Sequence, residues 1–199
     1  MELKDSKTKE NLLKAFAGES QARNRYEYAS EVAKKEGLYI IKNLFEYTAN
    51  QEKAHGEVFY GELKEFNGEN IEIKGTYPIG NYDSTLKLLK DSVHNEFEEY
   101  NNIYKDFANI ARNEGFEPIA AKFDKIAGIE KIHSERFQKY LSYLESGMLF
   151  KDNVDVQWIC TNCGYIYEGK EAPKVCPVCA YPQGYYMKFT ESDFNIKIN

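Results

Sequence analysis

The chain has 199 residues with a formal net charge of −6, and 42% of its residues are hydrophobic. That length fits one full domain plus a small module, and the apolar fraction is normal for a protein that buries a core. The acidic balance and the lack of a basic patch argue against nucleic acid as a partner. No apolar signal region opens the chain, and no apolar run approaches the ~20 residues that cross a bilayer. We therefore expect a cytoplasmic protein that binds neither nucleic acid nor a membrane.

Apolar and aromatic residues recur at helical intervals over residues 7–66 and again over residues 83–146. Gly37 interrupts the first stretch and Gly115 the second, so four long helices are predicted. The short connections make the helices of each pair antiparallel neighbours. Residues 67–82 between the pairs are rich in glycine and too long for a tight turn. A crossover along the bundle suits them, which indicates a mainly α protein with a ferritin-like four-helix bundle.

The two helical pairs form an internal repeat, in which residue 26 matches residue 104 at an offset of 78. One position breaks the register, because Glu19 falls on Phe97 while Glu96 stands one residue before it. If Glu19 and Glu96 have equivalent roles, the first or the third helix carries a one-residue register change. A π-bulge is the usual device for such a change near functional sites, and we expect one there.

Two Glu-x-x-His motifs, Glu52 to His55 and Glu130 to His133, lie at matching positions of the repeat. Residues three apart share a face of a helix, so each motif directs a carboxylate and an imidazole to one point. Dinuclear carboxylate sites in four-helix bundles use this motif on two helices and a glutamate from each of the other two. The motifs therefore predict a site for two metal ions.

Glu19 and Glu96 fill the remaining places, and Glu99 adds a carboxylate on the same face as Glu96. Oxygen ligands with imidazoles suit iron or manganese. Buried together without cations, such carboxylates would repel one another. Tyr26 and Tyr104 follow about two turns later and could donate hydrogen bonds to the ligands, although core packing is an ordinary role for either ring.

All four cysteines of the chain stand near its end, as Cys160, Cys163, Cys176 and Cys179. Two Cys-x-x-Cys pairs complete a tetrahedral thiolate shell that suits iron or zinc, and this spacing disfavours disulfides. So short a segment needs a bound metal to be stable. We expect a bundle over residues 1–146, a linker over 147–157 and a metal module with short β-strands over 158–199. A zinc ribbon is the alternative to an iron site.

These motifs stand in the order found in rubrerythrins, and the chain resembles that family over nearly its whole length. The module, with aromatic residues around its cysteines, resembles rubredoxin. The family reduces hydrogen peroxide to water as a defence against oxidants, so the resemblance implies a non-haem di-iron peroxidase. It also implies ligand roles: bridging for Glu52 and Glu130, terminal for Glu19, Glu96 and His133, and exchange of one iron between Glu99 and His55.

The resemblance further implies that the four cysteines hold an iron through which electrons enter. The donor would be a separate NAD(P)H-linked reductase or small redox protein, because the chain has no GxGxxG fingerprint. The family is commonly dimeric, with one subunit's module against the other's dinuclear site, so a head-to-tail homodimer is expected. Recombinant protein can take up zinc at either site.

Three alternatives use the same residues. A ferritin-like ferroxidase or iron-handling protein would oxidise Fe(II) for storage, and a redox or peroxide sensor would signal to another protein. A di-iron oxidase would carry a structural zinc ribbon. A ferroxidase has no need of an electron-transfer site of four thiolates, and a sensor needs only slow turnover.

Overall fold

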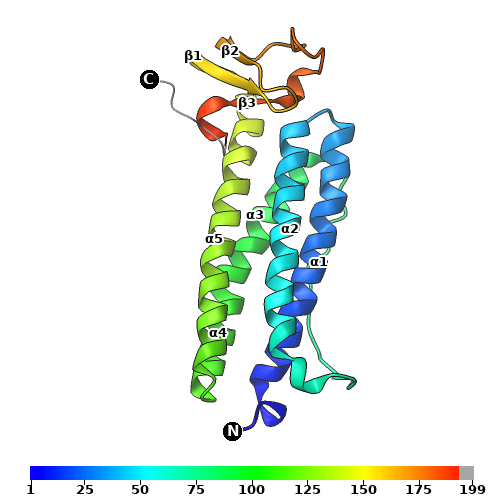
Figure 1. Cartoon of the computed structure of the whole chain (residues 1–199), viewed down its shortest axis with the longest axis vertical. Coiled ribbons are helices and arrows are strands. Elements are labelled where there is room, and N and C mark those ends of the chain that lie inside the picture. The colour runs from blue at the N-terminus through cyan, green and yellow to red at the C-terminus, as the bar shows by residue number, and fades with distance from the viewer. Residues whose placement is uncertain (193–199) are drawn as a thin grey trace.

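The computed structural model describes residues 1–192. They form an elongated bundle of helices with a small sheet at one end (Figure 1). The end of the expected metal module, residues 193–199, lies outside the described part. No helix within residues 1–192 is both long and apolar enough to span a bilayer.

The helices are α1 (Lys7–Lys35), α2 (Tyr39–Glu62), α3 (Thr85–Glu98), α4 (Tyr104–Asn113) and α5 (Glu117–Glu145). The first two form one antiparallel pair, and α3 and α4 together pair with α5 (Figure 1). Ser6 begins α1, because its hydroxyl accepts a hydrogen bond from the N–H of Lys9 at 3.1 Å. The ferritin-like bundle predicted from the helical periodicity is confirmed.

A π-helical turn, Glu99–Ile103, joins α3 to α4. This confirms the expected register change and places it in the third helical segment. The extra residue keeps Tyr104 and Ala108 on the same buried face as Leu89 and Glu96. Without it, the two halves of the repeat could not both present a glutamate and a tyrosine to the bundle interior.

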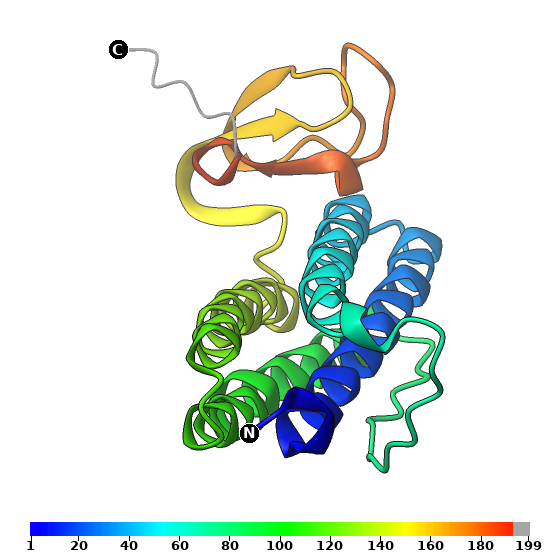
Figure 2. The same ribbon diagram turned by 60° about the horizontal axis from the view of Figure 1, so that its bottom comes forward.

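The crossover follows a short 3₁₀ turn, Lys64–Phe66, and runs as extended chain along the outside of α1 (Figure 2). Tyr77 attaches it to the bundle by donating a hydrogen bond from its hydroxyl to the carbonyl of Lys14 at 3.2 Å. Glu36 accepts a hydrogen bond from the N–H of Thr85 at 3.2 Å, where α3 begins. The chain thus crosses from one helical pair to the other along the bundle, as predicted.

The module contains three antiparallel strands in the order β2-β1-β3: β1 (Lys151–Cys160), β2 (Ile166–Glu171) and β3 (Tyr186–Lys188). The residues expected as a linker, 147–157, include the first part of this sheet, because β1 begins at Lys151. Lys151 pairs with Glu171, and Val156 pairs with Gly169. Strand pairing, which neighbouring residues do not reveal, incorporates this segment into the sheet.

Two apolar clusters fill the bundle, one on each side of a polar layer at its middle. Phe45 and Phe137 belong to the cluster next to the module, and Phe59 and Phe123 belong to the other. All four phenylalanine rings are fully buried. The metal-binding residues predicted from the sequence lie in the polar layer between the clusters. A rigid apolar core therefore holds that layer on both sides.

Candidate metal centres

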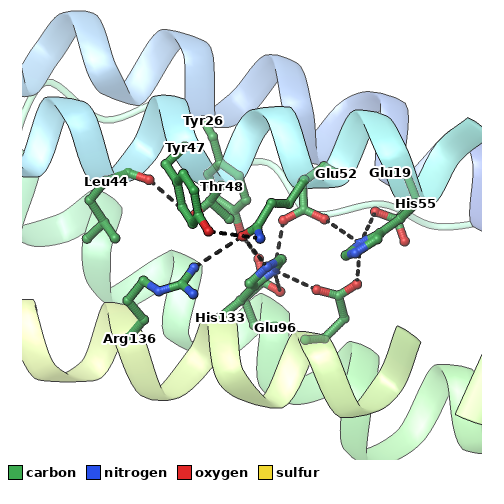
Figure 3. Close-up of polar contacts among 12 residues, drawn as sticks. Glu19, Tyr26, Leu44, Tyr47, Thr48, Glu52, His55, Glu96, His133 and Arg136 are labelled. Carbon is green, nitrogen blue, oxygen red and sulfur yellow. Dashed lines mark hydrogen bonds and ion pairs between the residues drawn. The ribbon is translucent and has the colours of Figure 1, made fainter. Parts of the chain in front are cut away.

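Six predicted ligands meet in this layer, contributed by α1, α2, α3 and α5: Glu19, Glu52, His55, Glu96, Glu130 and His133. All are buried, and the most exposed of them, His55, has a relative exposure of 7%. Each Glu-x-x-His motif presents both side chains to the interior, as residues three apart on a helix should. Figure 3 shows the two imidazoles facing the carboxylates.

The ligand atoms form two adjacent sets. The Nδ1 atom of His55 lies 2.8 Å from Glu130 Oε1, 3.2 Å from Glu52 Oε2 and 3.7 Å from Glu19 Oε2. The Nδ1 atom of His133 lies 2.7 Å from Glu130 Oε2, 3.0 Å from Glu52 Oε1 and 3.6 Å from Glu96 Oε2. Glu52 and Glu130 therefore give one oxygen to each set, while Glu19 and Glu96 serve one set each.

The polar atoms of this layer have few partners other than one another, which is costly in an interior without metal. Six buried atoms approach only the facing carboxylates or imidazoles and make no hydrogen bond of good geometry: Glu19 Oε2, Glu52 Oε1, Glu96 Oε2, both carboxylate oxygens of Glu130, and His133 Nδ1. A buried polar atom without a partner costs about 1–3 kcal/mol, and more when it is charged. Within each set the ligand atoms lie within 4.8 Å of one another. These residues fit two cations that share two bridging carboxylates.

Burial raises the pKa of Glu19 to about 8 and that of Glu96 to about 7. It also raises the pKa of Glu52, and the charge of Glu130 adds to that effect. Carboxylates this close cannot all ionise unless positive charge lies between them. Metal binding must therefore release protons from this layer.

Two tyrosines support the ligands across the bundle. Tyr26 on α1 donates its hydroxyl hydrogen bond to Glu96 on α3. Tyr104 on α4 donates to Glu19 on α1 at 2.5 Å. Each tyrosine thus holds the glutamate of the other half of the repeat. The sequence had suggested hydrogen bonds from both tyrosines to the ligands, but not which glutamate each one contacts.

Glu99 lies apart from both sets. It is partly exposed and lines a cavity of about 310 Å³ between α1, α4 and the crossover, together with Tyr77 and Tyr104. Burial and the charge of Glu96 raise the pKa of Glu99 well above its usual range. In this arrangement His55, and not Glu99, completes the first set.

The four cysteines converge in the module, as predicted, with ligand atoms within 4.8 Å of one another. The Sγ atoms of Cys160 and Cys179 are 3.8 Å apart, and those of Cys163 and Cys176 are 3.7 Å apart. After each pair the chain turns back through a residue with positive φ, Gly164 at +77° and Ala180 at +59°. The N–H of Gly164 donates to the carbonyl of Cys160 at 2.8 Å, and the N–H of Ala180 donates to the carbonyl of Cys176 at 2.9 Å. Two matching knuckles therefore enclose one metal position.

Two residues that the sequence analysis did not identify contact the second set. Gln51 Oε1 lies 3.0 Å from His133 Nε2, and Arg136 donates to the same oxygen at 3.2 Å. Neither belongs to a recognisable ligand motif. A departure from the repeat could have identified them. At the offset of 78 residues, Gln51 matches Ile129 and Arg136 matches Val58.

Bundle and sites together define a ferritin-like protein with a dinuclear metal site, joined to a rubredoxin-like four-cysteine module. A family model described as rubrerythrin matches residues 10–147, and one described as its rubredoxin-like domain matches residues 158–187. The chain belongs to the rubrerythrin family, which confirms the resemblance drawn from the motifs.

The rubrerythrin of Clostridium perfringens is 47% identical over 191 residues, covering 96% of this chain and 98% of that protein. The rubrerythrin of Porphyromonas gingivalis is 44% identical, covering 92% of this chain and 90% of that protein. Among solved structures, fully reduced, all-ferrous nigerythrin aligns with a TM-score of 0.62 at 28% identity, covering 92% of this chain and 90% of that one.

Proposed function

We propose that this protein is a peroxidase that reduces hydrogen peroxide to water at a di-iron site, as a cytoplasmic defence against oxidants. The observation that carries the proposal is the pair of ligand sets sharing Glu52 and Glu130 beside two histidines. When bound, two ferrous ions supply the two electrons that, with two protons, convert one peroxide molecule into two waters. Iron is favoured over softer metals because carboxylates dominate the donor set.

The chain offers a polar approach to this layer. A hollow of about 280 Å³ lies between α1 and α2, and Glu52 lines it together with Ser20, Arg23 and Asn24. A small polar molecule can be hydrogen-bonded there without disturbing the apolar clusters. Tyr26 and Tyr104 hold the outer glutamates in place, which keeps the ligand sets arranged before substrate arrives.

We propose that the four cysteines bind iron and admit electrons from an NAD(P)H-linked reductase or a small redox protein. A ferroxidase would have no use for this second site. Tyr185 of the module stacks on Tyr39 at the start of α2, with ring centroids 4.1 Å apart. Glu52 lies thirteen residues further along, roughly 20 Å at 1.5 Å per residue. Such a distance favours delivery from a partner's module, as in a head-to-tail homodimer.

Anaerobic stopped-flow absorbance of the reduced, iron-loaded protein tests the peroxidase. We expect hydrogen peroxide to oxidise it at least 100-fold faster than oxygen does. The iron of the module should then oxidise after the dinuclear site. Equal rates with the two oxidants would favour a ferroxidase or oxidase and overturn the proposal.

The electron route is tested with Cys163→Ser, because Cys163 is exposed and belongs to the module, outside the apolar clusters that fill the bundle. Turnover of peroxide with NADPH and a flavoprotein ferredoxin reductase should fall at least tenfold. A single oxidation of the prereduced dinuclear site should keep its rate. Unchanged turnover would identify the module as structural.

A further inference from the structure

One hydroxyl group of the module is buried without an ordinary hydrogen-bond partner. Tyr186 is the first residue of β3, and its side chain is 0% exposed within a single chain, so no partner subunit is needed to cover it. Within residues 1–192 its hydroxyl oxygen makes no hydrogen bond of good geometry. A buried hydroxyl of this kind is destabilising unless it faces an acceptor. A phenylalanine would fill the same space without that cost, so the hydroxyl itself requires an explanation.

The surroundings of Tyr186 contain two of the cysteines. Tyr186 pairs with Cys160 across β3 and β1, which places the two side chains on the same face of the sheet. Both belong to a buried cluster with Trp158, Ala172 and Cys176. Among these side chains only the cysteines accept a hydrogen bond, because alanine is apolar and an indole only donates. The side-chain acceptor available to the hydroxyl within this cluster is therefore a cysteine sulfur.

Cys176 is the cysteine that the hydroxyl reaches. Burial opposes its ionisation, but donation from the Tyr186 hydroxyl and from the backbone N–H groups of Cys179 and Val178 lowers its pKa to about 6. Cys160 holds the equivalent place in the other knuckle and also receives two backbone N–H groups, yet burial raises its pKa above the usual 9. The first cysteines of the two knuckles therefore differ by one hydroxyl donor. Burial, together with the same contact, raises the pKa of Tyr186 above its usual 10, so the hydroxyl keeps its proton.

We propose that Tyr186 is a positioning residue whose hydroxyl donates a hydrogen bond to the thiolate of metal-bound Cys176 and thereby raises the reduction potential of the four-cysteine iron. The proposal rests on the iron that the proposed function places in the module. Metal binding makes Cys176 a thiolate, which is a stronger acceptor than a thiol. The iron and its thiolates gain one negative charge when the ferric ion becomes ferrous. A donor to sulfur stabilises that more negative state, and hydrogen bonds to sulfur are among the features that set such potentials.

A higher potential favours the uptake of electrons by the module. One electron passes from the reductase or small redox protein to the ferric ion, which becomes ferrous, and the donor is oxidised by one electron. No proton moves in this step, because the hydroxyl of Tyr186 keeps its own. The module must deliver two electrons in turn for each peroxide molecule that is reduced. Tyr186 thus helps to keep the module reduced between deliveries.

Redox titration of the full-length, iron-loaded protein, followed by the visible absorbance of the ferric four-cysteine site, tests this. We expect Tyr186→Phe to lower the equilibrium constant for reduction of this iron at least threefold, which is about 28 mV at 59 mV per tenfold change for one electron. Tyr165→Phe is the matched control, because Tyr165 packs on the same cluster and its hydroxyl makes no hydrogen bond among the described residues. It should leave the constant unchanged.

A change in the opposite direction excludes an effect of packing alone. Replacement of Tyr186 by 3-fluorotyrosine keeps the ring and makes the hydroxyl a stronger donor, so it should raise the constant. This replacement also decides the question if Tyr186→Phe fails to bind iron. An unchanged constant in Tyr186→Phe, an equal fall in Tyr165→Phe, or no rise with 3-fluorotyrosine would overturn the proposal.

Resonance Raman spectroscopy of the ferric protein, loaded with iron in H2O or in D2O, detects the hydrogen bond directly. Protons bonded to sulfur shift the iron–sulfur stretching bands when deuterium replaces them. We expect part of that shift to disappear in Tyr186→Phe, leaving the part that comes from backbone N–H groups. Tyr165→Phe should keep the full shift. A full shift in Tyr186→Phe would show that its hydroxyl does not reach the sulfur.

These readouts separate the two proposals because they need iron in the module but neither peroxide nor a reductase. A lowered constant in Tyr186→Phe, together with slow oxidation of the parent protein by peroxide, would overturn only the peroxidase. An unchanged constant together with fast oxidation would overturn only the role of Tyr186.

Discussion

At the scale of single residues, the dinuclear site depends on hydrogen bonds that hold its ligands from distant parts of the chain. The Glu-x-x-His motifs are local, so their helix faces follow from sequence. The contact of Tyr104 with Glu19, and that of Gln51 with His133, join residues 85 and 82 positions apart. Only helix packing brings such pairs together. The ligand roles taken from the family remain predictions until metal is bound.

Tyr104→Phe tests the support of Glu19. Losing the 2.5 Å hydrogen bond frees the carboxylate to rotate, and loss of such a partner typically costs about 10–100-fold in metal affinity. We expect weaker binding of Fe(II) to one of the two positions, measured by anaerobic titration. Tyr28→Phe, at a side chain 69% exposed, is the control. Equal affinities for the two variants would show that Tyr104 only packs.

At the scale of elements, the repeat also contains a pair of helix caps. The carboxylate of Glu114, at the end of α4, accepts hydrogen bonds from the N–H of Lys7 at 3.0 Å and from the N–H of Thr8 at 2.9 Å. Glu36, its match in the repeat, accepts from the N–H of Thr85. Each helical pair thus caps the other, a relation that periodicity alone does not reveal. A negative charge at a helix N-terminus is also favoured by the helix dipole.

Glu114→Gln should lower the free energy of unfolding by about 1 kcal/mol, or Tm by about 2–4 °C. Partial burial opposes ionisation, but hydrogen bonds from Thr8 and Lys7 lower the pKa of Glu114 below its usual 4.5. A lowered carboxyl pKa stabilises the fold at pH above that value. The difference in free energy of unfolding between Glu114→Gln and the parent should therefore be largest at pH 7. It should disappear as the pH falls through the pKa of Glu114 in the folded protein.

Thermal unfolding of the metal-free protein between pH 3 and pH 7 measures this. Glu117→Gln is the matched control, since Glu117 forms an ion pair with Arg112 that is exposed to solvent and therefore stabilises the fold little. If the loss of stability in Glu114→Gln stayed constant with pH, the carboxylate charge of Glu114 would not contribute to capping α1.

The π-helical turn was foreseeable because two glutamates and two tyrosines disagree by one residue in their spacing. Its exact position was not, because the register change could have fallen in either helix. Deleting Asn102, an exposed residue of the turn, should restore a regular helix in which Glu96 and Tyr104 are spaced as Glu19 and Tyr26 are. The core register would be kept.

We therefore expect this deletion to retain helix content and a Tm within a few degrees of the parent, or higher. Peroxide turnover should fall at least tenfold, because Glu99, which opens the turn, would lose its place beside the 310 Å³ cavity. Circular dichroism and steady-state assays measure the two effects. A collapse of Tm would mean that the turn is required for folding instead.

At the scale of the whole molecule, the cysteines predicted the module, but nothing in the sequence predicted which surface of the bundle it contacts. Glu191 accepts a hydrogen bond from Tyr143 at 2.7 Å and pairs with Lys139 at 3.0 Å, both on α5. On the other side, Tyr185 stacks on Tyr39 of α2. These contacts join surfaces that local sequence patterns do not relate to one another.

The module approaches the bundle closely at Gly184, where an added β-carbon would lie 1.8 Å from the carbonyl oxygen of Gly37. Since that oxygen belongs to the backbone, Gly184→Ala must push the module away from the turn between α1 and α2. We expect hydrogen exchange to quicken at least tenfold in peptides covering residues 36–41 and 183–187. The four-cysteine site, which Gly184 does not ligate, should still bind metal.

Gly128→Ala is the matched control, because a β-carbon there meets nothing within 4 Å on the exposed face of α5. It should leave exchange at the module unchanged and stabilise the helix by up to about 1 kcal/mol. If hydrogen exchange in Gly184→Ala matched that in this control, the module would already move freely on the bundle in the parent protein. Faster exchange combined with unchanged peroxide turnover would instead show that the module does not deliver electrons from this position on its own bundle. The module of a partner subunit would then deliver them.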